Sequence, residues 1–326
     1  MPKYSIILPV YNGGEYVKTC VNSILAQTLP DFELLVLDNN STDGTREWIE
    51  SLDDHRILIH PSGYKLSMGE NWGRIVGVKK NEFMTVTGHD DVFHPEYLAI
   101  MDKLIGEDPA ATLYQSHFTY INANGKVVRK CKPMPARMMA GEFLAAEMTQ
   151  TMDSMGTGYM MRSALYDKLG GIPTYYPWLI FADYQLWVKL CMEGHMAVSK
   201  EEGFLYRLHQ SASRLTNGEE YQQAFSRYVE FLMTIKEDNP EIKTAIEKHA
   251  KDFLLYFCQA LSHRLLKTHP SDRIISVKAF IKKCKHFAKL LTPGQSFRPI
   301  LQPKILAALM LDNRIGLKAF GLYKKI

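Results

Sequence analysis

The sequence predicts an α/β fold, a Rossmann-like, mostly parallel mixed sheet with helices on both faces, followed by a helical carboxy-terminal region. Strand-like and helix-like segments alternate from the amino terminus to about residue 105. The first strand, over 5–10, is almost continuously apolar, as a parallel strand buried on both faces should be. From about Gly218 onward only helical periodicity remains, and prolines interrupt it.

The amino-terminal elements follow one another in βαβ order, which favours a doubly wound sheet. The expected strands, each with the helix that follows it, lie over 4–10 and 15–26, 32–38 and 43–51, 56–60 and 68–78, and 83–87 with a helix near Pro95. Asp43 can cap the second of these helices. The residues Asn122 to Gly125 predict a hairpin turn between strands over 113–121 and 126–130.

Composition bounds the class of protein. The chain has 326 residues, 46% hydrophobic and 23% charged, which is ordinary globular composition and allows two domains. Its five cysteines are scattered without a CxxC pair or metal-ligand spacing, so we expect a reduced, cytoplasmic location. No charged-then-apolar leader opens the chain, and no apolar run approaches the ~18 residues of a membrane span. We therefore expect neither export by a signal peptide nor an integral membrane protein.

Charge is distributed unevenly along the chain. Residues 262–326 carry 14 Lys or Arg against 2 Asp and no Glu, a net charge of +12, whereas the rest of the chain totals −8. Residues 275–291 are typical of a basic amphipathic helix, and 301–310 continue with a second apolar helical face. These helices either pack on the acidic body or contact a membrane surface, peripherally at the inner face of the plasma membrane. We expect no nucleic-acid partner, because charge is not accompanied by a binding motif.

Aspartates lie at the ends of two predicted strands. Asp38 closes the strand over 32–38, and Asp90 and Asp91 follow the strand over 83–87. Ligands of open α/β sheets bind beyond the carboxyl ends of the strands, where such carboxylates can hold a ribose and a divalent ion. This placement indicates a nucleotide and a metal.

Several linked motifs resemble the inverting family 2 glycosyltransferases, which have a GT-A fold. The resemblance rests on 5–12, on Ser-Ile-Leu-Ala-Gln-Thr at 23–28 and on 32–45, which contains Leu-Asp-Asn-Asn-Ser-Thr-Asp-Gly. It covers about the first two-thirds of the chain, to roughly Arg214. We therefore expect a GT-A catalytic domain over 1–214 and a helical, basic region over 215–326.

The resemblance implies a site for a nucleotide-sugar donor. Pro9, Tyr11 and Asn12 lie where the family forms the wall of the base pocket, and the ring of Tyr11 could stack on a pyrimidine. Asp38 and Asn39 fall on a family Asp-Asp pair whose second member often accepts a hydrogen bond from uracil. Because an amide can accept or donate, Asn39 leaves the base open, with UDP the first choice and dTDP the next.

A second part of the donor site is implied by the next motifs. Asn71 lies in a helix that borders the nucleotide in relatives, although Glu70 stands where many members carry arginine. Glycine also replaces the leading aspartate of the family's DxD-type signature at Gly88. Its surviving carboxylates imply that Asp90 contacts the ribose and that Asp91 binds Mn²⁺ or Mg²⁺.

Two further residues of the expected site, Arg207 and His209, lie in a motif late in the expected catalytic domain. His209 lies in a motif, 206–213, whose histidine can join the metal or the diphosphate in the family, and Arg207 is a candidate phosphate contact. Alone, a histidine beside a strand is more often structural.

The catalytic base is implied by the residues over 181–190, which resemble a family helix start. Asp183 matches the carboxylate that takes the proton of the acceptor hydroxyl. A first-turn aspartate could instead only stabilise the helix dipole. Ala182 replaces a frequent glutamate.

The resulting expectation is an inverting, metal-dependent glycosyltransferase of surface polysaccharide synthesis, such as O-antigen or capsule. Its acceptor would be a saccharide hydroxyl, including one carried on polyprenyl diphosphate. The alternative is a catalytically inactive, sugar-nucleotide-binding or scaffolding subunit, and the departures from the family pattern motivate it: Asn39, Glu70, Gly88 and Ala182.

Overall fold

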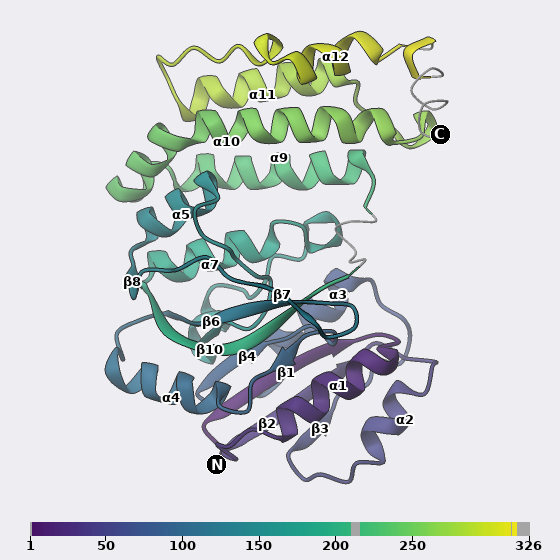
Figure 1. The fold of residues 1–326 in the computed structure, drawn as a ribbon, viewed down its shortest axis with the longest axis vertical. Helices are drawn as coiled ribbons and strands as arrows, with labels where there is room; N and C mark the ends of the chain where they lie inside the picture. Colours follow the sequence, from purple (N-terminus) through teal and green to yellow (C-terminus); the bar gives the residue numbers. More distant parts are fainter. Residues whose placement is uncertain (1, 210–215, 314, 318–326) are drawn as a thin grey trace. The chain divides into compact units, whose positions relative to one another are not determined.

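The computed structural model describes residues 2–209, 216–313 and 315–317. These residues form two compact units (Figure 1). The sheet unit contains the chain up to Phe143, Thr151–Tyr175 and the residues from Ala182 to His209. The helical unit contains Leu144–Gln150, Tyr176–Phe181 and the described residues after 215. The expected boundary between 214 and 215 lies outside the described residues.

Parallel strands form the first half of the sheet, in the order β3-β2-β1-β4. Their bounds are β1 (Tyr4–Val10), β2 (Phe32–Asp38), β3 (Ile57–Ile59) and β4 (Phe83–Val86). Every residue of β1 is buried, as its continuous apolar run predicts. The carboxyl ends of β1, β2 and β4 therefore share one edge of the sheet.

Helices connect these strands as the periodicity predicts, with one difference. The bounds are α1 (Gly14–Leu25), α2 (Thr45–Glu50), α3 (Met68–Gly73), the 3₁₀ helix η1 (Arg74–Gly77) and α4 (Tyr97–Glu107). The helix expected over 68–78 changes to a 3₁₀ turn at Arg74. The buried ammonium of Lys80 donates to the carbonyl oxygens of Ile75 (2.8 Å) and Val78 (2.9 Å) and so holds this turn.

The second half of the sheet is mixed, in the order β4-β9-β6-β10-β5, with β7 and β8 paired at its margins. The bounds are β5 (Val92–Phe93), β6 (Leu113–Asn122), β7 (Val127–Lys130), β8 (Arg137–Met138), β9 (Met160–Arg162) and β10 (Met196–Leu208). β6 and β7 form the predicted hairpin. β5 pairs antiparallel with β10, opposing Val92 to Leu205, so the residues just before β5 lie beside the end of β10.

Shorter elements complete the middle of the chain. They are α5 (Ala140–Thr149), α6 (Ser163–Lys168), the 3₁₀ helix η2 (Pro177–Leu179) and α7 (Ala182–Met192). In α7 the buried side chain of Trp187 donates from Nε1 to the carbonyl oxygen of Met155 (3.0 Å). This contact fixes the first turns of α7 against the segment Met155–Gly158.

The helical unit is built around an aromatic core in which Phe225 lies against Phe253 and Phe257. Its later elements are α9 (Gly218–Ile235), α10 (Pro240–Lys267), η3 (Pro270–Asp272), α11 (Val277–Leu291), η4 (Pro299–Leu301) and α12 (Pro303–Leu311). Asn217, Asn239 and Ser276 cap α9, α10 and α11 through their side-chain oxygens. No described helix is both long and apolar enough to cross a membrane.

Candidate active site

The turns after β1 and β2 are joined to each other by hydrogen bonds. Asn12 has a positive φ of 49°. Its backbone N–H donates to Ser41 Oγ (3.0 Å), and its side-chain Oδ1 accepts from the backbone N–H of Thr42 (2.8 Å). Gly13 N–H donates to Thr45 Oγ1 (3.0 Å). Asn12 thus links the two loops at the carboxyl edge of the sheet.

Asp38 and Asn39, at the end of β2, are both buried. The carboxylate of Asp38 accepts from the backbone N–H of Ser41 (3.3 Å). Asn39 Oδ1 accepts from Leu66 N–H (2.7 Å), and Asn39 Nδ2 donates to Leu66 O (2.9 Å). The side-chain amide of Asn39 therefore holds the loop around Leu66 with both its acceptor and its donor atom.

Asn71 and Arg74 support the same edge from α3 and η1. Asn71 Nδ2 donates to Leu37 O (3.1 Å), and its Oδ1 accepts from Arg74 Nη1 (2.9 Å). Arg74 also donates to the carbonyl oxygens of Asp38 (3.2 Å) and His60 (2.5 Å). These bonds hold the end of β2 and the loop after β3 together.

Glu70 has a local structural explanation. It forms a capping box with Ser67, in which Ser67 N–H donates to Glu70 Oε2 (2.8 Å) and Glu70 N–H donates to Ser67 Oγ (3.2 Å). The residue that replaces a frequent family arginine thus starts α3.

Pro9 and Tyr11 lie where β1 runs past the end of β4. The pairing of β1 with β4 ends at Ile7, opposite Val86. Pro9 lies beyond this last pair, so its missing N–H does not deprive β4 of a hydrogen bond. The Lys65 ammonium lies 4.2 Å from the centroid of the half-buried Tyr11 ring. The exposed ammonium of Lys65 therefore lies over one face of the Tyr11 ring.

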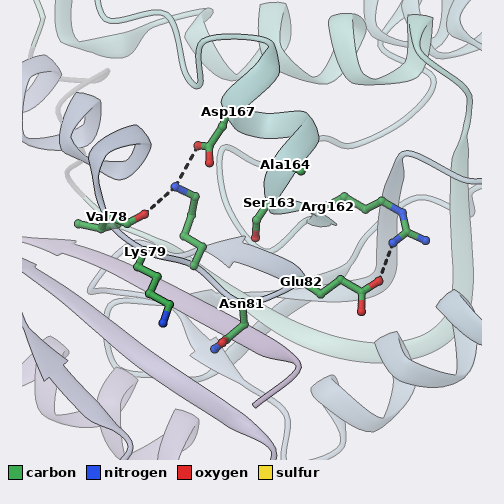
Figure 2. Close-up of a pocket in the computed structure, with 9 residues that line it drawn as sticks. Val78, Lys79, Asn81, Glu82, Arg162, Ser163, Ala164 and Asp167 are labelled. Carbon is green, nitrogen blue, oxygen red and sulfur yellow. Dashed lines mark hydrogen bonds and ion pairs between the residues drawn. The ribbon is translucent and has the colours of Figure 1, made fainter. Parts of the chain in front are cut away.

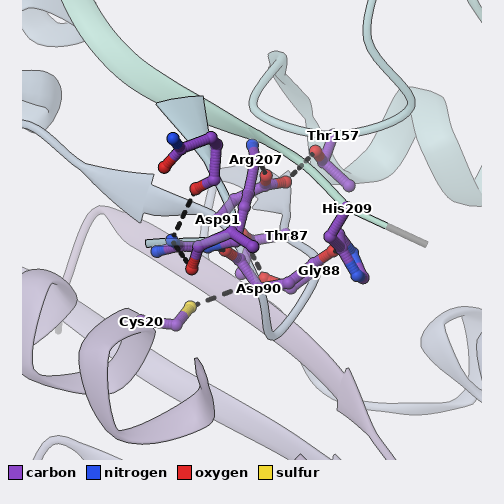
Figure 3. Close-up of polar contacts among 10 residues, drawn as sticks. Cys20, Thr87, Gly88, Asp90, Asp91, Thr157, Arg207 and His209 are labelled. Carbon is purple, nitrogen blue, oxygen red and sulfur yellow. Dashed lines mark hydrogen bonds and ion pairs between the residues drawn. The ribbon is translucent and has the colours of Figure 1, made fainter. Parts of the chain in front are cut away.

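Asp90 and His209 meet at the carboxyl edge (Figure 3). Asp90 Oδ2 and His209 Nε2 are in direct contact, and both side chains are about one-fifth exposed. Burial opposes ionisation of Asp90, but the hydrogen bond from His209 and the charges of His89 and His209 together outweigh it and lower the pKa of Asp90. The ring of Tyr16, on α1, packs edge-on against His209 with centroids 5.6 Å apart.

Asp91 points elsewhere and is only 2% exposed. Its Oδ1 accepts from the backbone N–H of Arg207 (2.9 Å), and its Oδ2 accepts from Thr157 Oγ1 (2.8 Å). Burial, together with the charge of Asp90, raises the pKa of Asp91. Asp91 thus joins three chain segments, whereas Asp90 is the carboxylate that faces His209.

Arg207 braces this arrangement with its guanidinium. Nε donates to Asp90 O (2.6 Å), and Nη1 donates to the carbonyl oxygens of Asn122 (3.2 Å) and Ala123 (3.1 Å). Its guanidinium carbon lies 4.8 Å from the centroid of the Tyr16 ring. The expected phosphate contact is therefore a buried side chain whose Nε and Nη1 atoms already bind backbone carbonyls.

Gly88 leaves room for the Asp90 carboxylate. A Cβ built at position 88 would lie 2.5 Å from Asp90 Oδ1. Any side chain at position 88, including the leading aspartate of the family motif, would therefore collide with the Asp90 carboxylate in its present position. Thr87 Oγ1 and Cys20 Sγ donate to the carbonyl oxygen of Gly88 (3.0 and 3.5 Å) and hold the turn (Figure 3).

Asp183 lies in the first turn of α7, beside the segment Met155–Gly158. A Cβ at Gly156 would lie 3.2 Å from Asp183 Oδ2, and the next residue, Thr157, binds Asp91. Burial raises the pKa of Asp183 to about 6. Burial and the charges of Asp91, Asp90 and Asp183 raise the pKa of Tyr206, so all three carboxylates act on one hydroxyl.

The structure thus gathers most of the expected site residues at one edge of the sheet. It brings Asp90, rather than Asp91, against His209, and it bonds the side chains of Asn39 and Asn71 to the protein. The sequence does not predict the hydrogen bond of Thr157 to Asp91 or the packing of Tyr16 on His209, because each contact joins segments that are distant in sequence. Residues 210–213 of the motif that contains His209 lie outside the described residues.

A pocket of about 420 Å³ lies away from these residues (Figure 2). It is lined by residues 78–82, before β4, and by Arg162 to Ala164 and Asp167. Ion pairs of Arg162 with Glu82 (2.7 Å) and of Lys80 with Asp167 (2.9 Å) fill much of its polar wall. It adjoins the amino end of β4, whereas the candidate site adjoins the carboxyl end.

Comparison with known proteins adds independent information. A model of the family described as glycosyl transferase family 2 matches residues 5–170. The chain is 24% identical over 265 residues to an uncharacterized glycosyltransferase of Rickettsia typhi, covering 78% of this chain and 80% of that protein. It is 23% identical over 264 residues to the Escherichia coli UDP-Glc:alpha-D-GlcNAc-diphosphoundecaprenol beta-1,3-glucosyltransferase WfgD, covering 76% and 96%.

Solved structures share the fold. S. aureus TarS in complex with UDP-GlcNAc has a TM-score of 0.70 at 15% identity and covers 98% of this chain and 92% of its own. The mannosyltransferase PcManGT from Pyrobaculum calidifontis, in complex with GDP-Man and Mn²⁺, has a TM-score of 0.51 at 16% identity, covering 100% and 88%. These similarities confirm the predicted α/β fold with a helical carboxy-terminal region.

Proposed function

The chain belongs to glycosyl transferase family 2, and from this membership and the geometry of the site we propose that it moves a sugar from a UDP-linked donor, with inversion, to a saccharide hydroxyl. It is a glycosyltransferase that uses a nucleotide-sugar donor. The names of two similar proteins, one a UDP-Glc-dependent glucosyltransferase and one bound to UDP-GlcNAc, support uridine as the base.

The observation that carries the proposal is that one short segment contacts both acidic groups. In Met155–Gly158, Thr157 binds Asp91 and the adjacent Gly156 packs against Asp183. In this proposal a donor diphosphate near Asp90 presents its anomeric carbon toward the carboxylate of Asp183. Inverting transfer needs this order of leaving group, carbon and base.

In the reaction, the acceptor oxygen forms a bond to the anomeric carbon as the bond from that carbon to the diphosphate oxygen breaks. Asp183 accepts the hydroxyl proton, and its raised pKa suits a base that works near neutral pH. The diphosphate departs with the bonding electron pair. Tyr11, Asn12 and Asp38 would form the wall on which the nucleoside rests.

Asn39 and Asn71 would shape the donor pocket from behind. Their amides bind Leu66, Leu37 and Arg74, so they would determine the position of the loop after β3. Pro9 belongs to the same wall. In this proposal the base is recognised by backbone groups of that loop and by the ring of Tyr11.

The residues at the carboxyl edge fit a divalent cation that arrives with the donor. Among the described residues, no group of three or more His, Cys, Asp or Glu side chains is arranged to hold a metal. Asp90 and His209 supply two donor atoms, and Mg²⁺ is commonly held by one or two carboxylates together with phosphate oxygens and water. When bound there, Mn²⁺ or Mg²⁺ would stabilise the negative charge of the departing diphosphate.

We further propose that the acceptor belongs to surface polysaccharide synthesis and that a polyprenyl diphosphate can carry it. The diphosphoundecaprenol acceptor in the name of the E. coli relative supports this class. An exposed aromatic side chain of the sheet unit, Tyr175, precedes Asp183 in the chain and offers a face on which a sugar ring could stack. The reaction would take place at the inner face of the plasma membrane, and the five free, buried cysteines agree with a reducing compartment.

Nucleotide binding tests the donor and the cation together. We expect UDP-sugars to raise the melting temperature more than GDP- or dTDP-sugars, and only when Mn²⁺ is present. Asp90→Asn should remove the Mn²⁺-dependent shift. Asp53→Asn, a matched change at an exposed residue with a positive φ of 47°, should keep it. No shift with any nucleotide sugar would refute the proposal.

Turnover tests the transfer itself. The wild type should release UDP slowly with Mn²⁺ and donor alone, and faster with a saccharide on polyprenyl diphosphate. Donor binding without UDP release across a broad panel of acceptors would instead support a sugar-nucleotide-binding subunit.

A further inference from the structure

The segment between Asp272 and Asp312 has an unusual charge. Its 39 residues, Arg273 to Leu311, contain 8 Lys or Arg and no Asp or Glu. It folds into α11, η4 and α12 of the helical unit. Every Asp, Glu, Lys or Arg side chain that this segment contributes to the surface is therefore cationic.

The exposed side of α11 carries a stripe of lysines. They repeat at i, i+4, i+7 and i+11, which places them on one helix face and spreads them over about 16 Å: Lys278, Lys282, Lys285 and Lys289. The ion pairs of the helical unit among described residues involve other cations: Lys236 with Glu247, Lys243 with Glu237, and Arg273 with Asp312. The positive charge of the stripe is thus not neutralised within this part of the protein.

The outer face of α12 is apolar. Ile305 and Ala308 face inward and are fully buried. The opposite face repeats at i, i+3, i+4 and i+7 with exposed apolar residues only: Pro303, Leu306, Ala307 and Met310. Of these, Leu306 is 44% and Met310 69% exposed, and Leu301 in the preceding η4 is 71% exposed.

Buried hydrogen bonds connect α11, which carries the lysine stripe, to the end of α12, which carries the apolar face. Asp312, just after α12, accepts from Arg273 Nη2 (2.6 Å) and from the backbone N–H of Val277 (2.7 Å), the first residue of α11. Arg273 and Asp312 are each only 8% exposed. The end of α12 is therefore fixed at the start of α11, and Figure 1 shows the two helices side by side.

We propose that α11, η4 and α12 form a docking surface for an anionic lipid bilayer. The lysines would bind lipid headgroups, and Leu301, Leu306 and Met310 would enter the boundary with the acyl chains. A nucleic acid would satisfy the lysines but would gain nothing from exposed leucine and methionine. A second copy of the chain would bring the same positive stripe against itself.

This inference rests on the proposed function and extends it, since an acceptor carried on a polyprenyl diphosphate would lie in the bilayer to which the protein binds. Lipid binding needs neither donor nor acceptor, so the two can fail separately. Loss of vesicle binding with intact UDP-dependent melting shifts would overturn only the docking surface. Vesicle binding without any nucleotide shift would overturn only the proposed function.

Sedimentation of the full chain with vesicles tests the proposal. We expect it to sediment with phosphatidylcholine vesicles that contain phosphatidylglycerol and to remain in solution with phosphatidylcholine alone. Replacing the four lysines of the stripe by Gln should weaken the binding at least ~10-fold. The matched control carries the same charge change at exposed positions elsewhere: Lys79, Lys126, Lys200 and Lys248, each to Gln. Equal binding of both variants would overturn the assignment.

The apolar face is tested by the double variant Leu306→Ser, Met310→Ser. We expect a loss of vesicle binding on the order of 10-fold. The control is Val127→Ser, Val128→Ser, two exposed apolar residues on β7. Circular dichroism and melting temperature must match the wild type for both variants. If the face instead joins two copies, the wild type will be a dimer that the Leu306, Met310 variant splits, and that result would overturn lipid docking.

Discussion

Asp183 has the environment that a general base requires. Burial raises its pKa from an ordinary 3.8 to about 6, so its carboxylate is ionised at neutral pH and still accepts a proton readily. We expect kcat/KM to be constant above pH 7 and to fall about tenfold per pH unit below 6, measured at saturating Mn²⁺. Asp183→Asn should lower kcat by ~10²- to 10⁴-fold and keep the melting shift caused by UDP-sugar.

A matched control separates catalysis from a helix-dipole effect. Glu15 also lies in the first turn of a helix, α1, and is exposed. Glu15→Gln should leave kcat unchanged. Similar small effects of Glu15→Gln and Asp183→Asn would show that Asp183 only stabilises its helix.

The same carboxylate should reduce stability at neutral pH. Its pKa is higher in the folded than in the unfolded chain, so the folded state binds more protons between about pH 4 and 6, and the free energy of unfolding falls as pH rises through this window. Asp183→Asn should therefore raise the melting temperature at pH 8 and change it little at pH 4. The corresponding gain in free energy of unfolding at pH 8 has an upper limit of about 3 kcal/mol. A lower melting temperature of the variant at pH 8 would contradict this assignment.

Gly88 is expected to be required, although the family motif that this turn resembles begins with aspartate. A Cβ at this position would approach Asp90 Oδ1 to 2.5 Å and displace the carboxylate from His209. Gly88→Ala and Gly88→Asp should both reduce Mn²⁺-dependent UDP release by at least ~10-fold, because a small misplacement of a charged group is costly in a site. The control is Gly106→Ala in α4, whose added Cβ would meet no atom within 4 Å. Higher activity of Gly88→Asp would contradict the steric argument.

At the scale of elements, the segment Met155–Gly158 links the end of β4, the turn before β5 and α7. Gly158 N–H donates to Val86 O (3.0 Å), Thr157 binds Asp91, and Met155 O accepts from Trp187. Its position determines how far Asp183 lies from the acidic pair. Thr157 is therefore a positioning residue.

Substitution of Thr157 tests this role. Thr157→Val leaves a buried Asp91 oxygen without its partner, so we expect a loss of about 1–3 kcal/mol in unfolding free energy and a lower kcat. Thr157→Ser keeps the hydroxyl and should retain both. Denaturant titration and initial rates provide the measurements. Equal behaviour of the Val and Ser variants would show that the hydrogen bond is dispensable.

At the scale of the whole molecule, the helical unit is not a simple tail. Phe181, two residues before Asp183, belongs to it and stacks on Tyr228, with ring centroids 5.3 Å apart and planes at 10°. Tyr221 and Phe257 also contact its ring. The helical unit therefore anchors the chain directly before the proposed base.

Deletion should expose this dependence. A chain that ends at Asn217 loses α9 to α12 and every one of these ring partners of Phe181, so we expect aggregation or a greatly reduced melting temperature, seen by gel filtration and thermal unfolding. A chain that ends at Asn313 keeps all of these helices and should behave as the wild type does in both measurements. A stable, monomeric chain ending at Asn217 would contradict the anchoring role.

Most of the fold could be read from local patterns. The apolar run of β1, the Asn-Gly turn after β6 and the helical periodicity after Gly218 each reflect short-range physics, namely burial on both strand faces, turn chemistry and the helix repeat. The residues proposed to carry the chemistry, Asp90 and Asp183 among them, could be recognised from the sequence because their neighbours form motifs that resemble those of the family.

Long-range contacts settled the rest. Which of two adjacent carboxylates meets His209 depends on how the turn after β4 approaches the end of β10, more than a hundred residues later, and Gly88 and Thr157 take part in that choice. Likewise, nothing local assigns Phe181 to the helical unit. A motif specifies which groups are present, whereas the direction of each side chain follows from packing and hydrogen bonds between distant segments.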